Sequence, residues 1–201
     1  MEEELLINQN EYLEGGIHIA TKMKSQGMAK FVYKVREDGL YLLDVKTIDF
    51  RIRIAAKMIA RYDPSRVVVR ASRIYAIYAA EKFAEITGVQ LLKGRTTPGI
   101  FTNPKRDNFM EPQLLFISDS RNEKQSINEA SNTSIPIIAL SDTDNLTKYV
   151  DLIIPVNNRG RRSLAYIYYL LAREVMIERG EIKSREEFKY TVDDFEAKLK
   201  K

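Results

Sequence analysis

Five short runs dominated by valine, isoleucine and leucine recur along the chain, and each is followed by a polar segment. They cover residues 67–69, 89–92, 114–117, 135–140 and 151–156, and they are nearly free of charge. Strands that are apolar along their whole length are typical of a parallel sheet that is buried on both faces. We therefore predict an α/β fold, a three-layer doubly wound domain with a mainly parallel sheet of the Rossmann-like or flavodoxin-like type.

Helical patterns separate the runs. Apolar residues recur at three- and four-residue spacing between positions 48 and 59, in a helix that we expect Thr47 to cap. Ser72 is the expected cap of a helix over residues 74–86, which Gly88 closes. Further helices are expected over residues 122–131 and 161–179, and strands at 30–35 and 40–45 around Glu37-Asp38-Gly39 predict a short antiparallel hairpin.

A chain of 201 residues with 44% hydrophobic content fits one domain. We divide it into an irregular basic N-terminal segment (1–29), an α/β core (30–183) and a charged, weakly amphipathic C-terminal tail (184–201). The absence of cysteine excludes disulfides and thiolate metal sites, and His18 is the only histidine, which excludes an imidazole cluster. No run approaches the ~20 apolar residues of a membrane span, so we expect a cytoplasmic protein.

In a doubly wound sheet, the loops that leave the carboxyl ends of the strands meet at one rim. The longest of them, residues 94–106, contains two glycines and two prolines beside Arg95, Lys105 and Arg106. These features predict a non-helical basic loop that contacts an anionic partner. Phe101 interrupts the polar run, and it either anchors the loop on its own domain, which we favour, or stacks on a nucleic-acid base.

A second basic run, Arg159, Arg161 and Arg162, precedes and opens a helix. Cations are unfavourable at the positive end of the helix dipole unless an anion lies there, so the run suggests a phosphate partner. The alternative is a solvated helix start that Asn157, Asn158 or Ser163 caps. The sequence leaves both interpretations open.

An enzyme also deserves consideration, because the carboxyl rim is the usual ligand site of this fold. Asp119, Asp142 and Asp144 fall there and could hold magnesium for a sugar-phosphate or nucleotide-binding enzyme, although such aspartates more often cap helices or bind loop amides. The chain has no glycine-rich dinucleotide fingerprint and no Walker loop. A protein-only scaffold is a third alternative, with the basic rim facing acidic proteins and the acidic tail docking elsewhere.

Ordered motifs over almost the whole chain are similar to those of the ribosomal protein S-two (laminin-receptor-like) family in its archaeal form. The motifs are Gly-Ile-His-Ile-Ala-Thr (16–21), Tyr-Lys-Val-Arg (33–36), Asp-Gly-Leu-Tyr (38–41), Leu-Asp-Val (43–45), Arg-Ile-Arg-Ile-Ala-Ala (51–56), Ala-Arg-Tyr-Asp-Pro-Ser (60–65), Gly-Arg-Thr-Thr-Pro-Gly (94–99), Thr-Asn-Pro (102–104), Glu-Pro (111–112), Ile-Pro-Ile-Ile-Ala-Leu (135–140), Asp-Thr-Asp-Asn (142–145) and the run from Val150 to Ser163. The chain departs from the family pattern at Ile100-Phe101, Lys105-Arg106 and Asp119-Ser120.

The resemblance implies a non-enzymatic component of the small ribosomal subunit. Such a protein docks on small-subunit rRNA near the junction of head and body and contacts neighbouring ribosomal proteins. The short path from Val45 to Arg66 leaves no room for the coiled-coil insertion of bacterial members. The resemblance implies no cofactor, metal, membrane or small-molecule substrate.

Combining the basic rim with the resemblance, we predict an RNA-binding set in which lysine and arginine contact phosphates and the hydroxyl and amide side chains assist. Lys22 and Lys24 of the N-terminal segment are the weaker members. The full set is Lys22, Lys24, Arg95, Thr96, Thr97, Thr102, Asn103, Lys105, Arg106, Asn157, Asn158, Arg159, Arg161 and Arg162.

Overall fold

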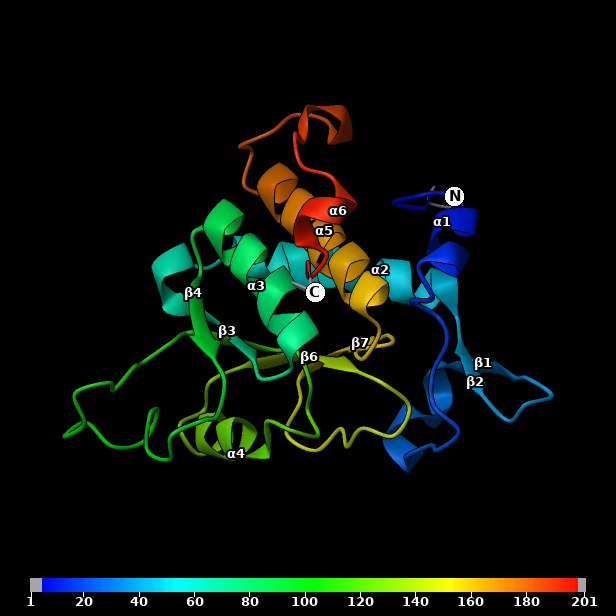
Figure 1. The fold of residues 1–201 in the computed structure, drawn as a ribbon. Helices are drawn as coiled ribbons and strands as arrows, with labels where there is room; N and C mark the ends of the chain where they lie inside the picture. Colours follow the sequence, from blue (N-terminus) through cyan, green and yellow to red (C-terminus); the bar gives the residue numbers. More distant parts are fainter. Residues whose placement is uncertain (1–4, 199–201) are drawn as a thin grey trace.

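A five-stranded parallel sheet forms the centre of the computed structural model, which describes residues 5–198 (Figure 1). Its strands are β3 (Val67–Ala71), β4 (Gln90–Lys93), β5 (Leu114–Ile117), β6 (Ile137–Ser141) and β7 (Leu152–Pro155), in the order β4-β3-β5-β6-β7. The first strand of the sheet lies between the second and the third, which is the flavodoxin-like order. The predicted doubly wound fold is confirmed, with strand ends that differ from the expected ones by at most two residues.

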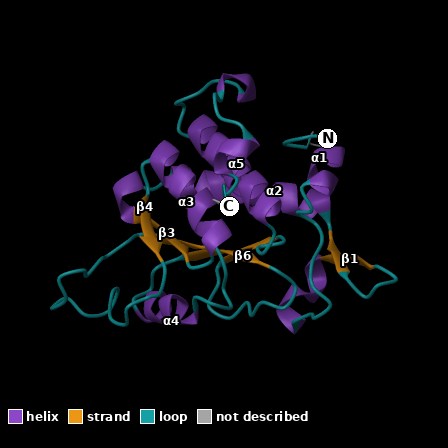
Figure 2. Cartoon of the chain, viewed as in Figure 1, coloured by secondary structure: helices purple, strands orange, loops and turns teal. Residues whose placement is uncertain are grey.

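Helices cover both faces of the sheet (Figures 1 and 2). On one face lie α2 (Val45–Ala60), α3 (Ile74–Thr87) and α5 (Arg161–Glu178), and on the other lies α4 (Lys124–Asn132). Because side chains alternate along a strand, Val67 and Val69 enter the core under α2, α3 and α5, while Val68 enters the smaller core beside α4. Both faces of the sheet are therefore buried, as the uncharged strand sequences predicted.

The predicted apolar face of α2 is confirmed, since Ile48, Ile52 and Ile59 are fully buried. The predicted cap is wrong. Asp44 caps the helix by accepting hydrogen bonds from the backbone N–H groups of Lys46 (3.3 Å) and Thr47 (3.1 Å). The preceding strand already ends at Leu43, so the helix begins one turn earlier than expected.

The other helix ends agree more closely with the expected ones. At α3 the N-cap position is Arg73 instead of Ser72, and no side-chain capping bond is present there within the described residues. Gly88 ends this helix in the left-handed conformation with φ = 73°, as its position after the helix predicted.

The predicted hairpin is present as β1 (Val32–Val35) and β2 (Tyr41–Leu43). The segment before it is more ordered than expected, because it contains α1 (Gln9–Glu14) and the 3-10 helix η1 (Gln26–Phe31), which includes the first two residues of the expected strand. Ile19 also bridges to Leu42 of β2. The expectation of an irregular segment is thus only partly correct.

The chain after α5 packs on that helix. It contains the short 3-10 helix η3 (Arg185–Glu187) and α6 (Val192–Phe195). Phe188 and Phe195 are buried, and their rings lie 5.5 and 6.0 Å from the ring of Tyr169. Aromatic contacts therefore hold the tail on α5, although the charged composition of the tail did not indicate them. Residues 1–4 and 199–201 of the predicted terminal segments lie outside the described part of the chain.

The turn η2 (Pro64–Arg66) joins α2 to the first strand of the parallel sheet. Within the described range 5–198, no helix combines the length and the apolar character that crossing a membrane requires.

Candidate nucleic-acid interface

All five strands of the central sheet run in the same direction, so the loops after them lie along one rim. Two of these loops, at positions 94–106 and 156–162, carry predicted RNA-binding residues, and two more, at 118–121 and 142–145, carry Asp119, Asp142 and Asp144. The predicted convergence on one rim is confirmed. The charged side chains of the rim differ in whether they form ion pairs and hydrogen bonds within the protein.

A buried arginine holds the start of the loop 94–106. Arg70 lies in β3 and is only 2% exposed. Its guanidinium donates hydrogen bonds to the carbonyl oxygen of Leu92 (2.9 Å), to the hydroxyl of Thr96 (2.9 Å) and to the carbonyl oxygen of Gly94. Burial lowers the pKa of Arg70, and the nearby Glu123 opposes that shift. These hydrogen bonds attach the first residues of the loop to the sheet.

Glu129 of α4 holds the middle of the same loop. Its carboxylate accepts hydrogen bonds from the backbone N–H groups of Gly99 (2.8 Å) and Phe101 (3.2 Å). Burial alone would raise the pKa of Glu129, but the bonds from Gln125 and from these two amides lower it below its usual value. The loop geometry thus depends on a charged carboxylate beneath it.

Phe101 anchors the loop on its own domain. Its side chain is 2% exposed and belongs to the apolar cluster that Ile100, Leu115, Ile117 and Ile127 also form. This burial confirms the anchoring role that we favoured over stacking on a base. The aromatic residue is unavailable at the surface of the loop.

The polar side chains of the loop point in two directions. Thr97, Thr102, Asn103 and the bases Arg95 and Lys105 are exposed. In contrast, the hydroxyl of Thr96 is shared by Arg70 and Ser126. The guanidinium of Arg106 donates a hydrogen bond to the carbonyl oxygen of Pro98, so this side chain helps to hold the loop in its conformation.

The loop borders a hollow of about 540 Å³ at the rim, lined by Arg70, Ser72, Gly94, Arg95, Thr96, Pro98, Asn122 and Gln125. Close to it, Glu123 is buried, and burial raises its pKa to about 8 despite the nearby charge of Arg70. A neutral carboxyl group at this depth explains how it tolerates burial without a full set of partners.

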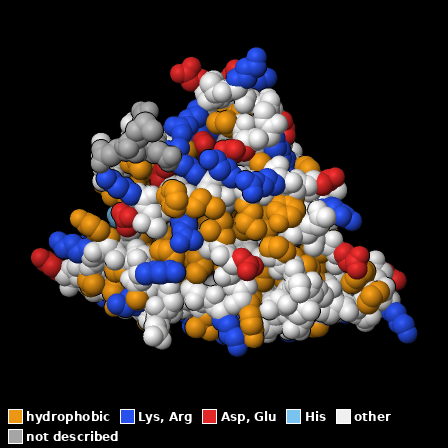
Figure 3. All heavy atoms as spheres, turned by 180° about the vertical axis from the view of Figure 1, so that it is seen from behind, with side chains coloured by type: hydrophobic (Ala, Val, Ile, Leu, Met, Phe, Trp, Pro, Cys, Tyr) orange, Lys and Arg blue, Asp and Glu red, His pale blue; other side chains and the backbone are white. Residues whose placement is uncertain are grey.

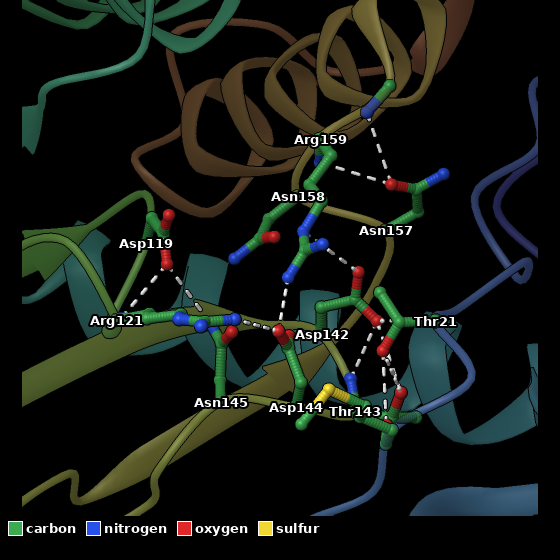
Figure 4. A network of polar contacts seen from close by, with 12 residues as sticks. Thr21, Asp119, Arg121, Asp142, Thr143, Asp144, Asn145, Asn157, Asn158 and Arg159 are labelled. Atoms are coloured by element: carbon green, nitrogen blue, oxygen red, sulfur yellow. Dashed lines mark hydrogen bonds and ion pairs between the residues drawn. The ribbon is translucent and has the colours of Figure 1, made fainter.

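The aspartates of the rim form an internal polar network (Figure 4). Asp142 accepts hydrogen bonds from the backbone N–H groups of Thr143 (2.6 Å) and Thr21 (3.2 Å), and Asp144 pairs with Arg121 at 2.5 Å and with Arg159. Burial raises the pKa of Asp142, and the bonds from Thr143 together with the charge of Arg159 offset this only in part.

Asp119 is engaged in the same way. It binds the guanidinium of Arg73 (2.6 Å), the backbone N–H of Arg121 (2.9 Å) and the side-chain amide of Asn145 (3.3 Å). In the part of the chain that the structure describes, no three histidine, cysteine, aspartate or glutamate side chains are placed to hold a metal ion. The loop-binding role of these aspartates is thus the one that the geometry favours.

The second basic run lies at the start of α5 and is largely paired. Asn157 caps this turn, because its side-chain oxygen accepts hydrogen bonds from the backbone N–H groups of Arg159 (3.0 Å) and Gly160 (3.1 Å). Arg159 pairs with Asp144, and Arg161 pairs with Glu196 of the tail at 2.5 Å. Only Arg162 of the run is exposed without a carboxylate contact within residues 5–198, and it lies over the Tyr166 ring at 5.8 Å.

The remaining predicted residues lie at the edges of this rim. Asn158 is buried and donates to the carbonyl oxygen of Leu140 (3.2 Å). Lys22 and Lys24 are exposed, and the ammonium of Lys24 lies 5.2 Å from the Tyr41 ring. Their segment joins the rim because Thr21 bonds to Asp142 and Thr143.

Sequence reasoning missed the residues that shape the rim, namely Arg70, Arg73, Arg121, Glu123 and Glu129. One signal was available for Arg70, because it directly follows three valines of a predicted buried strand. A charge in such a strand needs buried partners. His18 lines a groove together with Tyr33 and Leu42, and burial lowers its pKa.

Comparison with known proteins agrees with the resemblance seen in the motifs. The family model described as ribosomal protein S2 matches residues 105–177. Proteins named small ribosomal subunit protein uS2 are similar along nearly the whole chain, that of Thermoplasma acidophilum with 48% identity over 99% of this chain and 100% of its own length. The protein of Thermofilum pendens shares 51% identity (99% and 93% coverage), and that of Saccharolobus solfataricus shares 48% (98% and 85%).

The relatives are archaeal, and their names describe components of a ribosomal subunit and not enzymes. The identity extends through the hairpin, the parallel sheet and the tail, because it covers 98–99% of the chain. The chain therefore belongs to the ribosomal protein S2 family, in its archaeal form.

Proposed function

We propose that this protein is a structural constituent of the small subunit of cytoplasmic ribosomes, which binds small-subunit rRNA through its carboxyl rim near the junction of head and body. Membership of the S2 family supports the structural, non-enzymatic role in the small subunit. The engagement of Asp119 and Asp142 by internal partners agrees with that role. Neighbouring ribosomal proteins are its further partners in the proposal, and its 201 residues act as one domain.

The observation that carries the rRNA proposal is the contrast between the rigid underside of the loop 94–106 and its basic upper surface. Arg95 and Lys105 are exposed, and neither has an ion pair within residues 5–198. Arg70 and Glu129 hold the loop from below. A preorganised surface loses little conformational freedom on binding, and lysine and arginine contacts to phosphate are the usual way in which proteins are positioned on RNA.

The other predicted residues take secondary places in the proposal. Thr97, Thr102 and Asn103 offer hydrogen bonds beside the two loop bases, and Lys22, Lys24 and Arg162 add exposed charge around the rim. Arg159 and Arg161 would contact phosphate while keeping or exchanging their carboxylate partners. Thr96, Arg106, Asn157 and Asn158 contribute mainly by shaping the surface that the RNA contacts.

Crosslinking from the loop tests the proposal directly. A photoreactive amino acid replaces Thr102, which is exposed, and the variant is incorporated into small subunits. We expect irradiation to join the loop to small-subunit rRNA. The matched control places the same group at Lys183, an exposed residue that follows α5 at the far end from the rim. Adducts to proteins alone from position 102 would refute rRNA binding by this loop and favour the protein-only scaffold.

A further inference from the structure

Helix α2 has a second apolar stripe beside the residues that it buries completely in the core. Phe50, Ile54 and Met58 follow one another at four-residue spacing, so they lie on one side of the helix over about 12 Å. The side chain of Phe50 is 55% exposed, whereas Ile54 and Met58 pack against the edge of the core and keep only part of their surface exposed. The completely buried residues of the helix already fill the core. A helix that is apolar on both sides is expected to be covered on both sides.

The stripe is surrounded by positive charge. Arg51 and Lys57 of α2 lie beside it, as does Arg61, which directly follows the helix. The helix has a single acidic residue, Asp49, which is buried and accepts a hydrogen bond from the hydroxyl of Tyr12 (2.9 Å). Figure 3, which views the molecule from behind, shows hydrophobic side chains gathered in the middle of that side, with lysine, arginine and several acidic groups around them.

The bases beside the stripe are only weakly engaged. The ammonium of Lys57 lies 3.9 Å from Glu178, and the guanidinium of Arg51 lies 5.3 Å from the Phe31 ring. Arg61 is exposed, and the structure gives it no ion pair within residues 5–198. An exposed ion pair at such a distance contributes little to stability, so these charges are available to a partner.

We infer that the stripe Phe50, Ile54 and Met58 is the docking site for an amphipathic helix of a neighbouring small-subunit protein, whose apolar side is flanked by aspartate and glutamate. The aliphatic side chains favour a protein, because an RNA backbone offers phosphates and no apolar stripe to bury. A second copy of this chain is disfavoured because two such faces would bring bases against bases. The inference rests on the place of the chain in the small subunit and is independent of rRNA binding at the rim.

Site-specific crosslinking identifies the occupant. A benzophenone amino acid replaces Phe50, and the variant is purified within small subunits after its co-sedimentation has been established. We expect one protein adduct, whose crosslinked peptide carries apolar residues at helical spacing beside several acidic residues. The same group at Tyr78, which is 45% exposed on α3, serves as the matched control and should not give this adduct. An adduct with RNA, an adduct with a second copy, or no adduct from position 50 overturns the inference.

Binding of the identified peptide then tests the charge argument. The peptide is synthesised with a fluorophore, and its anisotropy is titrated with the free full-length protein. We expect Phe50→Ser and Arg61→Glu each to weaken binding at least tenfold, and Tyr78→Ser to leave it unchanged. Thermal unfolding establishes that the variants are folded. Equal affinity for the wild type and Phe50→Ser would overturn the inference, whereas a loss of rRNA crosslinking at Thr102 alone would affect only the proposal about the rim.

Discussion

Two basic clusters of this protein look alike in the sequence and differ in the structure. The loop 94–106 has exposed bases above and an internal framework below, in which Arg70 and Glu129 bind its backbone. The start of α5 has its bases turned to internal carboxylates, with Arg159 on Asp144 and Arg161 on Glu196. The loop has bases without an ion pair in the described residues, whereas two of the three bases at the helix start are paired with carboxylates of the protein.

The comparison teaches that the number of bases in a run does not measure the surface charge available to RNA. That surface charge depends on whether each base is paired with a carboxylate of the protein. In the loop, the buried groups are one arginine and one glutamate that bind backbone, so the charges of Arg95 and Lys105 remain free for a ligand. At the helix start, Asp142 and Asp144 of the loop after β6 pair with Arg159, and Glu196 pairs with Arg161, so only Arg162 of the run has no carboxylate contact within residues 5–198.

The largest expected effect is the loss of the loop anchor. Phe101→Ala removes a buried aromatic ring from the cluster beside α4 and leaves a cavity, which should lower the free energy of unfolding by about 3–5 kcal/mol. Denaturant unfolding measures this loss. Phe50→Ala is the matched control, because its ring is 55% exposed and its removal should cost less than ~1 kcal/mol. Equal losses in the two variants would contradict the anchoring role.

Removing the buried guanidinium should have a slightly smaller effect. Arg70→Met keeps an unbranched side chain but removes the guanidinium and leaves the carbonyl oxygens of Leu92 and Gly94 without their donor, at a cost of about 3 kcal/mol in unfolding free energy. We also expect faster amide hydrogen exchange over residues 94–106. The exposed neighbour gives the control, since Arg95→Met should change stability by no more than ~0.5 kcal/mol. A rigid loop in Arg70→Met would show that something else holds it.

The buried carboxyl group of Glu123, close to the hollow that the loop borders, should make the stability of the protein depend on pH. The pKa of Glu123 is about 8 in the folded protein and ordinary in the unfolded chain, so the folded state binds the extra proton and this contribution to stability falls as pH rises from about 4.5 to 8. Glu123→Gln should remove that fall and stabilise the protein at pH 8 by on the order of 2–3 kcal/mol relative to wild type. Thermal unfolding of both proteins at pH 5 and pH 8 measures this difference in stability. An unchanged pH profile in the variant would contradict the raised pKa.

The smallest stability effect is expected at the paired helix start. Arg161→Gln breaks the ion pair with Glu196, and because the side chain of Arg161 is 47% exposed the loss should be about 0.2–1 kcal/mol. A double-mutant cycle with Glu196→Gln isolates the pair. A coupling energy near zero would mean that Arg161 is as free as the loop bases, and the distinction between the two clusters would weaken.

Much of the fold follows from patterns that are local in the sequence. The uncharged strands, the apolar face of α2 and the glycine after α3 depend on spacing alone, and all were predicted. The N-cap of α2 was assigned to Thr47 instead of Asp44 because the end of the hairpin determines where that helix begins. The tail was underestimated because Phe188 and Phe195 find their aromatic partner on α5, outside the segment itself.

The candidate site shows the same limit more strongly. The residues of the rim could be predicted because a parallel sheet brings the ends of its strands together. The sequence could not show which bases lack an ion-pair partner, because the partners lie far along the chain. Asp144 pairs with Arg121, and Glu196 pairs with Arg161. The framework residue Glu129 lies on a short helix whose sequence does not indicate that it binds the loop.

The salt dependence of rRNA binding is the sharpest test of the proposal that Arg95 and Lys105 contact phosphates. Filter binding to small subunits that lack this protein gives the slope of the logarithm of the association constant against the logarithm of salt concentration. The double variant Arg95→Gln with Lys105→Gln should reduce that slope by about two units, one for each lost phosphate contact, while Lys183→Gln leaves it unchanged. Unchanged affinity and slope in the double variant would contradict the account.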